Sequence, residues 1–183
     1  MMCFRKWLAA TFAVLLLAGV AAAADTVSGG KVKSINAENK TFVLTDSSGK
    51  DFTFSLADNA VINRAGTESK GDLKSGDAIN VGYDKGLVTW TAHYILVQEG
   101  KSLNNELIRG NVKGYDADKK ELSFTNENKK DSTYPMGKAE VRCNMEDAKI
   151  ENIKIGDHAL LIVNTVDGRS TLECMMVDRP KSN

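Results

Sequence analysis

The sequence Gly30-Lys31-Val32-Lys33 recurs as Gly110-Asn111-Val112-Lys113, and this match decides how the chain is organised. The same spacing holds without a gap for longer stretches: residues 50–54 match residues 130–134, Val61 matches Val141, and residues 73–77 match residues 153–157. Similarity at one fixed spacing indicates repeated structural units. We therefore predict two tandem domains, residues 25–102 and residues 103–183. Each is long enough to fold around one core.

Each predicted domain consists of short alternating segments separated by turn sequences. In the first domain, apolar residues alternate with polar ones in four segments: Phe42 and Leu44; Phe52, Phe54 and Leu56; Ile79, Val81 and Tyr83; and Val88, Trp90, Ala92, Tyr94 and Leu96. Period two predicts half-buried antiparallel strands. Residues 27–35 predict a further strand, in which the pair Gly29-Gly30 indicates a bend. Residues 68–74 predict one helical turn before the fourth strand. The predicted fold is all-β, with two tandem five-stranded OB-like Greek-key barrels.

The first 24 residues form a separate segment that predicts export. Arg5 and Lys6 precede an uncharged, Leu/Val/Ala-rich run from residue 7 to 24, and the small residues Ala22 and Ala24 precede Asp25. This order is typical of a secretory signal peptide, with cleavage expected after Ala24. The alternative is an uncleaved anchor, because about 18 apolar residues approach the length that spans a bilayer. With cleavage we expect a periplasmic or secreted protein without a stable membrane span.

Charge and composition exclude several classes of function. The whole chain has 24 basic and 24 acidic residues, and removal of residues 1–24 leaves 22 basic and 24 acidic ones. A slightly acidic exported chain has no positive field for phosphate backbones, so we expect no nucleic-acid partner. No local signature places a nucleophile beside either histidine, His93 or His158. We expect His93 to be exposed and His158 to be dispensable for the fold, and we predict that the protein is not an enzyme.

Two segments carry a resemblance to known exported domains. The pattern Gly-x-Val-Lys-x-Ile from Gly30, and the later Leu-Lys-Ser-Gly-Asp-x-Ile-x-Val from Leu73, resemble small exported bacterial OB-like domains of unknown function. The chain is more distantly similar to the periplasmic copper and silver chaperones. Those proteins carry a His, a Trp and two Met on their early strands, whereas residues 41–56 contain none of these residue types. The resemblance implies fold and compartment rather than ligand.

Sulfur is distributed unequally between the predicted domains. After residue 24, every Cys and Met lies in the second domain: Met136, Cys143, Met145, Cys174, Met175 and Met176. Three interpretations of this group remain open. Cys143 and Cys174 form a disulfide, as exported cysteines often do. They are instead free, buried thiols. Or Cys143, Met145, Cys174 and Met176, on strands with Val141 and Leu172 on their core faces, bind a soft ion such as Cu(I), which would make copper a cofactor.

Aromatic residues of the first domain indicate a further candidate surface. Tyr83, Trp90 and Tyr94 lie on two successive predicted strands. OB-like domains bind extended ligands by stacking on such rings, although the same residues are also suitable core fillers. The sequence thus favours an exported, non-enzymatic binding or adaptor module of the cell envelope, whose partner is an envelope protein or a small ligand. Soft-metal binding by the second domain is the alternative.

Overall fold

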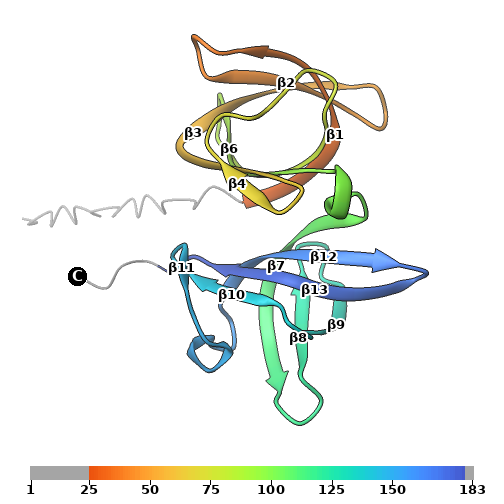
Figure 1. Ribbon diagram of the computed structural model, residues 1–183. Coiled ribbons are helices and arrows are strands. Elements are labelled where there is room, and N and C mark those ends of the chain that lie inside the picture. Colours follow the sequence, from red (N-terminus) through yellow and green to blue (C-terminus); the bar gives the residue numbers. More distant parts are fainter. Residues whose placement is uncertain (1–24, 180–183) are drawn as a thin grey trace, which may run out of the picture.

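The computed structural model describes residues 25–179, and the predicted signal peptide, residues 1–24, lies outside the described residues. The described chain is all-β, as predicted, and forms two sheets (Figure 1). The first half contains β1 (Asp25–Asn36), β2 (Thr41–Asp46), β3 (Asp51–Arg64), β4 (Thr67–Ser69), β5 (Ala78–Lys85), β6 (Trp90–Val97) and the 3₁₀ turn η1 (Gly100–Ser102). The second half contains β7 (Asn105–Asp116), β8 (Glu121–Asn126), β9 (Asp131–Pro135), β10 (Glu140–Cys143), β11 (Glu146–Asp147), the 3₁₀ turn η2 (Ile150–Asn152), β12 (His158–Val166) and β13 (Arg169–Val177).

The first sheet closes into a five-stranded barrel. Strand β1 pairs with β2 on one side and with β5 on the other, and β3 pairs with β2 and β6. The pair β5–β6 completes the ring, which is visible in the upper part of Figure 1. The β3–β6 pair is parallel and the others in the ring are antiparallel. This closed five-stranded ring agrees with the barrel predicted for the first half. The second half, predicted as another five-stranded barrel, instead forms a seven-stranded sheet in the order β11-β10-β13-β12-β7-β8-β9.

A glycine on the first strand of each half makes this geometry possible. Gly30 pairs with Asp46 of β2 and with Ile79 of β5, so β1 leaves one neighbour for the other at this residue. A Cβ atom at Gly30 would lie 2.3 Å from the backbone oxygen of Thr45. Gly110 occupies the same place on β7, where a Cβ would lie 2.0 Å from the backbone oxygen of Thr125. The repeated glycine is therefore required by close backbone approach.

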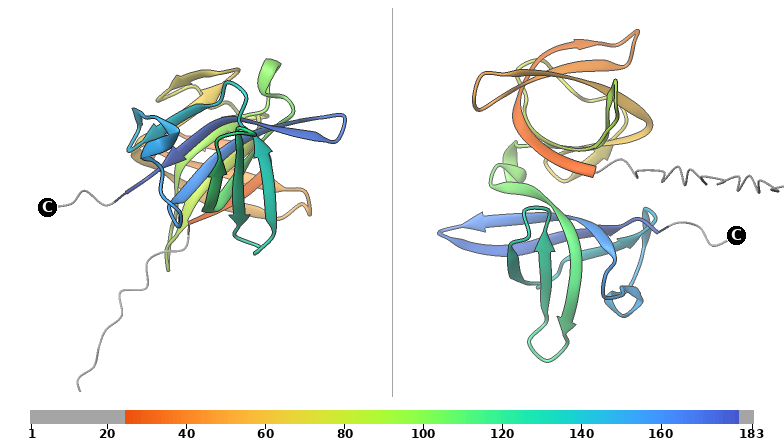
Figure 2. Two further views of the ribbon diagram at one scale, coloured as in Figure 1. Left: turned by 90° about the horizontal axis from the view of Figure 1, so that it is seen from below. Right: turned by 180° about the vertical axis from the view of Figure 1, so that it is seen from behind.

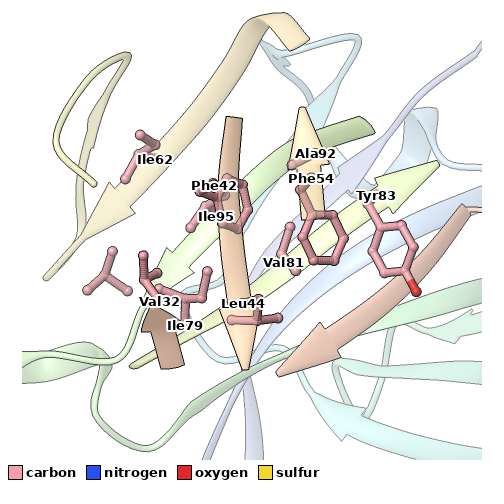
Figure 3. Packing of buried hydrophobic residues seen from close by; sticks show 11 residues of the cluster. Val32, Phe42, Leu44, Phe54, Ile62, Ile79, Val81, Tyr83, Ala92 and Ile95 are labelled. Carbon is pink, nitrogen blue, oxygen red and sulfur yellow. The ribbon is translucent and has the colours of Figure 1, made fainter. Parts of the chain in front are cut away.

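The core of the first barrel comes from the alternating residues. Phe42, Phe54 and Tyr83 are buried, with the Phe42 and Phe54 rings stacked 5.2 Å apart and Tyr83 edge-on to Phe54. Figure 3 shows these rings together with aliphatic side chains from β1, β5 and β6, all pointing into one interior. Burial of one face of every strand gives the hydrophobic driving force that the period-two pattern predicts.

Local interactions also recur between the halves at the spacing of the sequence match. Asp51 accepts hydrogen bonds from Lys33 and from Thr45, and Asp131 accepts them from Lys113 and from Thr125 in the same way. The turn before the fourth long strand repeats as well, because the backbone N–H groups of Lys74 and Lys154 donate to Asp77 and Asp157. The repeated residues thus make repeated contacts, and their origin in one duplicated unit stays a prediction.

The halves differ at their third strand. In the first half β3 is continuous, whereas in the second half β9 ends at Pro135 and β10 starts at Glu140. Val141 pairs with Met175 as Ile62 pairs with Ile95, so Val141 corresponds to Ile62 and not to Val61. The spacing between matched positions is therefore shorter by one here, and the gapless match of Val61 with Val141 is wrong. The helical turn predicted over residues 68–74 is also wrong, because β4 pairs with the end of β3.

The two halves pack against each other through a buried apolar cluster. We call it the junction cluster; it consists of Tyr94, Leu96, Leu107, Leu160, Ile162, Cys174 and Met176, with Val27 and Val61 at its edge. In Figures 1 and 2, β12 and β13 form the side of the second half that faces the first. Arg142 donates to Glu68 across the junction at 2.7 Å, and the Leu107 N–H donates to Asn80 at 3.2 Å. No helix among residues 25–179 is long and apolar enough to cross a membrane.

Candidate functional site

A cavity of about 240 Å³ opens beside the junction cluster. We call it the junction cavity, and both halves line it: Asn59, Val61, Asp84, His93 and Tyr94 from the first, and Arg109, Met145, His158, Ala159, Leu160, Met176 and Asp178 from the second. The two histidines of the sequence are both in this list. Concave sites that combine apolar walls with a few convergent polar groups are the usual places for ligands.

The first half contributes a histidine–carboxylate pair. His93 Nε2 lies 2.8 Å from Asp84 Oδ2, and both side chains are partly exposed. Gly82 of β5 pairs with Tyr94 and Tyr83 pairs with Ala92, so His93 is an extra, bulged residue on β6 that has no partner in the register. Ala92 lies in the barrel core while His93 and Tyr94 line the cavity. His93 is therefore not the freely exposed residue that the sequence predicts.

The second half contributes a partly buried cation, Arg109, and a second histidine, His158. Burial lowers the pKa of the Arg109 guanidinium, and the nearby carboxylates of Asp84, Glu127 and Asp178 oppose this shift. Burial also lowers the pKa of His158, and the positive charge of Arg109 acts in the same direction. His158 is thus held toward its neutral form, and a neutral imidazole is both a hydrogen-bonding group and a common metal ligand. The cavity offers ligands both charged groups and neutral imidazole.

The structure divides the four predicted sulfur ligands among different places. Met145 and Met176 both line the junction cavity, whereas Cys174 lines a separate polar cavity of about 310 Å³ with Glu68 and Arg142. Met145 lies in the turn after β10 with a positive φ of 65°, so it is not on the predicted strand. Among residues 25–179, no group of three or more His, Cys, Asp and Glu side chains is placed to hold a metal ion.

A bulge on β13 explains the placement of Cys174 and Met176. Leu172 pairs with Val163 and Cys174 pairs with the adjacent Ile162, so Glu173 is an extra residue on β13. The bulge reverses the alternation: Leu172 lies in the core of the second half, while Cys174 and Met176 lie in the junction cluster. The prediction that Cys174 and Met176 share the core face of Leu172 is therefore wrong.

Cys143 and Cys174 are both free thiols in the structure. Their strands are parallel neighbours, with Cys174 opposite Glu140 and Cys143 opposite Val177. Because residues paired in register point to the same face of a sheet, Cys143 lies on the face of Val177, which is in the core cluster of the second half. Cys174 lies on the opposite face, toward the first half. The arrangement does not bring the predicted disulfide partners together.

We expect the two thiols to react at very different rates in the folded protein. Burial raises the pKa of the Cys174 thiol to about 11. At pH 8 the thiolate fraction of Cys174 is then about 0.1%, and its side chain is buried whereas Cys143 is partly exposed to the reagent. Ellman's reagent should therefore modify the Cys143→Ser variant at least 100-fold more slowly than the Cys174→Ser variant, and unfolding should abolish the difference. Equal rates, or no titratable thiol in unreduced denatured protein, would contradict this arrangement.

The predicted aromatic surface is only partly present. Trp90 stacks on Tyr83 at 5.2 Å and on Phe52 at 5.0 Å, but Tyr83 is buried in the barrel core. Lys50 and Lys85 cover the Phe52 and Trp90 rings, at 4.9 and 5.2 Å from the ring centroids. Tyr94 lies apart from this stack, in the junction cluster, where it donates to Glu68 at 3.0 Å. Most of the ring area is thus used in packing rather than offered to a ligand.

Comparisons with known proteins show no family for this chain. No protein-family model matches it, and no curated protein matches it. A solved structure described as "Crystal structure of Ag(I)CusF" is similar over 40% of this chain and 97% of that chain, with 15% sequence identity and a TM-score of 0.33. A TM-score below 0.5 supports no conclusion about ligand or function.

Proposed function

We propose that the protein is an exported, non-enzymatic binding module of the cell envelope that holds a small ligand in the junction cavity. The observation that carries the proposal is the composition of the cavity, where His93 and Asp84 of one half meet Arg109 and His158 of the other. A volume of about 240 Å³ is below the ~300–1,000 Å³ typical for drug-sized ligands, so the ligand is small. The export signal predicted in residues 1–24 supports the periplasm or the exterior as its compartment.

Native mass spectrometry of protein purified from its own compartment tests this proposal. We expect a retained small molecule whose mass disappears on denaturation and is absent from the His93→Ala/His158→Ala double variant. Tyr115→Ala removes a partly exposed ring elsewhere on the second half and is the matched control. A wild-type spectrum without any retained mass, or the same mass in the double variant, would count against the junction cavity as the binding site.

A second candidate function is soft-metal binding in the same cavity. The observation in its favour is that Met145 and Met176 line the cavity together with His93 and His158. Thioether sulfur and neutral imidazole are ligands that suit Cu(I). The residues that fit are therefore the two methionines and the two histidines, and the two cysteines lie elsewhere.

We expect the Met145→Leu/Met176→Leu double variant to bind Cu(I) at least tenfold more weakly than the wild type. Leucine keeps the volume and removes only the thioether. Competition with a chromogenic Cu(I) chelator under reducing conditions measures the change. Met136→Leu, in the core of the second half, is the matched control, and Cys143→Ser/Cys174→Ser should keep full affinity. Loss of binding in the cysteine variant alone would assign the metal to the cysteines, and no competition by the wild type would exclude this function.

A further inference from the structure

A further cavity, of about 320 Å³, lies at one end of the first barrel, away from the junction cavity. It is bounded by the β1–β2 turn, the middle of β3 and the loop between β4 and β5. We call it the end pocket. Aliphatic side chains supply much of its wall, among them Leu56, Ala60, Ile62 and Leu73. Lys70 and Gly71 also line the pocket.

The second half shows what occupies the corresponding place. Two contacts align the loops of the two halves. At the start of the loop, the Ala148 N–H donates to the Val141 carbonyl, and in the first half Ser69 pairs with Ile62 in the same way. At its end, the backbone carbonyl of Asn152 accepts a hydrogen bond from Arg179, as that of Asp72 does from Arg64. Between these anchors the second half has positions 149, 150 and 151, whereas the first half has only positions 70 and 71. The loop of the second half is therefore longer by one position.

The position gained in the second half brings an aliphatic side chain to its core. Ile150, in η2, packs against the core cluster of the second half. The first half has Lys70 and Gly71 instead. A Cβ atom built on Gly71 meets no atom within 4 Å, and both Lys70 and Gly71 are exposed. The first barrel therefore keeps an open apolar end, whereas the second half carries its own isoleucine at the corresponding place.

The charge at the rim of the end pocket favours a ligand with a negatively charged group. Lys40 and Asp58 form an ion pair at 2.8 Å and neutralise each other, while Lys70 stands exposed at the same rim. The rim thus carries a net positive charge. In the second half the isoleucine is followed directly by an acidic residue, Glu151. An aliphatic residue next to a carboxylate is complementary to both the walls and the rim.

We propose that the end pocket is a peptide-binding site that takes a branched aliphatic side chain, with an acidic neighbour, from a partner protein. The aliphatic side chain of the partner would occupy the place that Ile150 occupies in the second half; we call such a side chain the plug. This site is separate from the junction cavity and does not depend on the function proposed for it. It gives the module a second, protein-directed surface.

A titration with the chain's own plug sequence tests the proposal. The probe is the peptide acetyl-Ala-Lys-Ile-Glu-Asn-amide, the sequence of residues 148–152, added to ¹⁵N-labelled protein of residues 25–183. We expect saturable shifts of the amide signals that line the end pocket. Replacement of the peptide isoleucine by alanine should weaken binding at least tenfold, because the buried methyl groups are lost.

Two protein variants and one control sharpen the result. Gly71→Ile should fill the pocket, raise the melting temperature and abolish peptide binding, whereas Gly114→Ile, at a glycine of β7 that also faces open space, should leave binding unchanged. Lys70→Glu should weaken the binding of this peptide about threefold or more, and should favour a peptide in which its glutamate is replaced by lysine. His93→Ala/His158→Ala should have no effect. The proposal is overturned if the peptide causes no shift of the amide signals, if the alanine peptide binds as tightly as the isoleucine peptide, or if the Gly71→Ile variant binds the peptide as well as the wild type. It is also overturned if the end pocket binds lauric acid but does not bind the peptide.

Discussion

The Gly110→Ala variant should melt about 10 °C below the wild type. A Cβ at this position would lie 2.0 Å from the Thr125 oxygen and 2.7 Å from the Asn126 Cα, both of them backbone atoms that cannot rotate away. Strands β7 and β8 must separate where β7 passes from one neighbour to the other. Overpacking of this kind costs about 3 kcal/mol, and for a chain of this size 1 kcal/mol corresponds to about 2–4 °C. Thermal unfolding followed by circular dichroism measures the change.

Gly114→Ala is the control for this prediction. Gly114 is on the same strand, but a Cβ there would meet no atom within 4 Å, so we expect a change in melting temperature within about 2 °C, in line with surface substitutions. Equal stability of the Gly110→Ala and Gly114→Ala variants would show that the close approach of β7 to β8 does not limit the stability of the second half.

The Leu96→Asp variant should separate the two halves without unfolding either of them. Leu96 is completely buried in the junction cluster, on the outer face of the first barrel. A buried, unpaired carboxylate at this position costs several kcal/mol of stability. If the two halves separate, the carboxylate becomes hydrated and this cost is removed. Separation exposes Cys174, which lies in the same cluster. We therefore expect the reaction of Cys174 with Ellman's reagent to accelerate at least tenfold in the Leu96→Asp/Cys143→Ser background.

Val166→Asp provides the matched control, because Val166 is half exposed on the second half and outside the junction cluster. It should leave the reactivity of Cys174 unchanged and the circular dichroism spectrum intact. Unaltered reactivity in Leu96→Asp, with a folded spectrum, would mean that the junction cluster does not shield Cys174. Loss of the folded spectrum in Leu96→Asp would mean that Leu96 is required for the first barrel itself to stay folded.

The sequence predicts the fold well because strand alternation and turn residues act locally. Phe42, Phe54, Ile79 and Val81 fill the core of the first barrel as period two requires. The failures arise from single-residue changes in register. Glu173 adds a bulge that turns Cys174 and Met176 to the outside of the second half. No local pattern distinguishes a strand with such a bulge from one without it.

The candidate site was less predictable than the fold because it depends on how the halves pack. His93 and His158 are on the outer faces of β6 and β12, far apart in the chain, and they share a cavity only across the junction. The one available signal is the uninterrupted apolar run in each strand, residues 94–97 of β6 and residues 159–163 of β12, which puts apolar residues such as Leu96 and Leu160 on both faces. Outward-facing leucines predict a covered surface but do not identify what covers it.

Both functions proposed for the junction cavity require that the two halves hold one fixed arrangement. ¹⁵N relaxation of the wild-type protein, residues 25–183, measures this directly. We predict that amide groups of β1–β6 and of β7–β13 report a single rotational correlation time, that of one body of the full size. Two separate, shorter times, one for each half, would contradict the account, because a cavity lined by His93 and His158 together would not then persist.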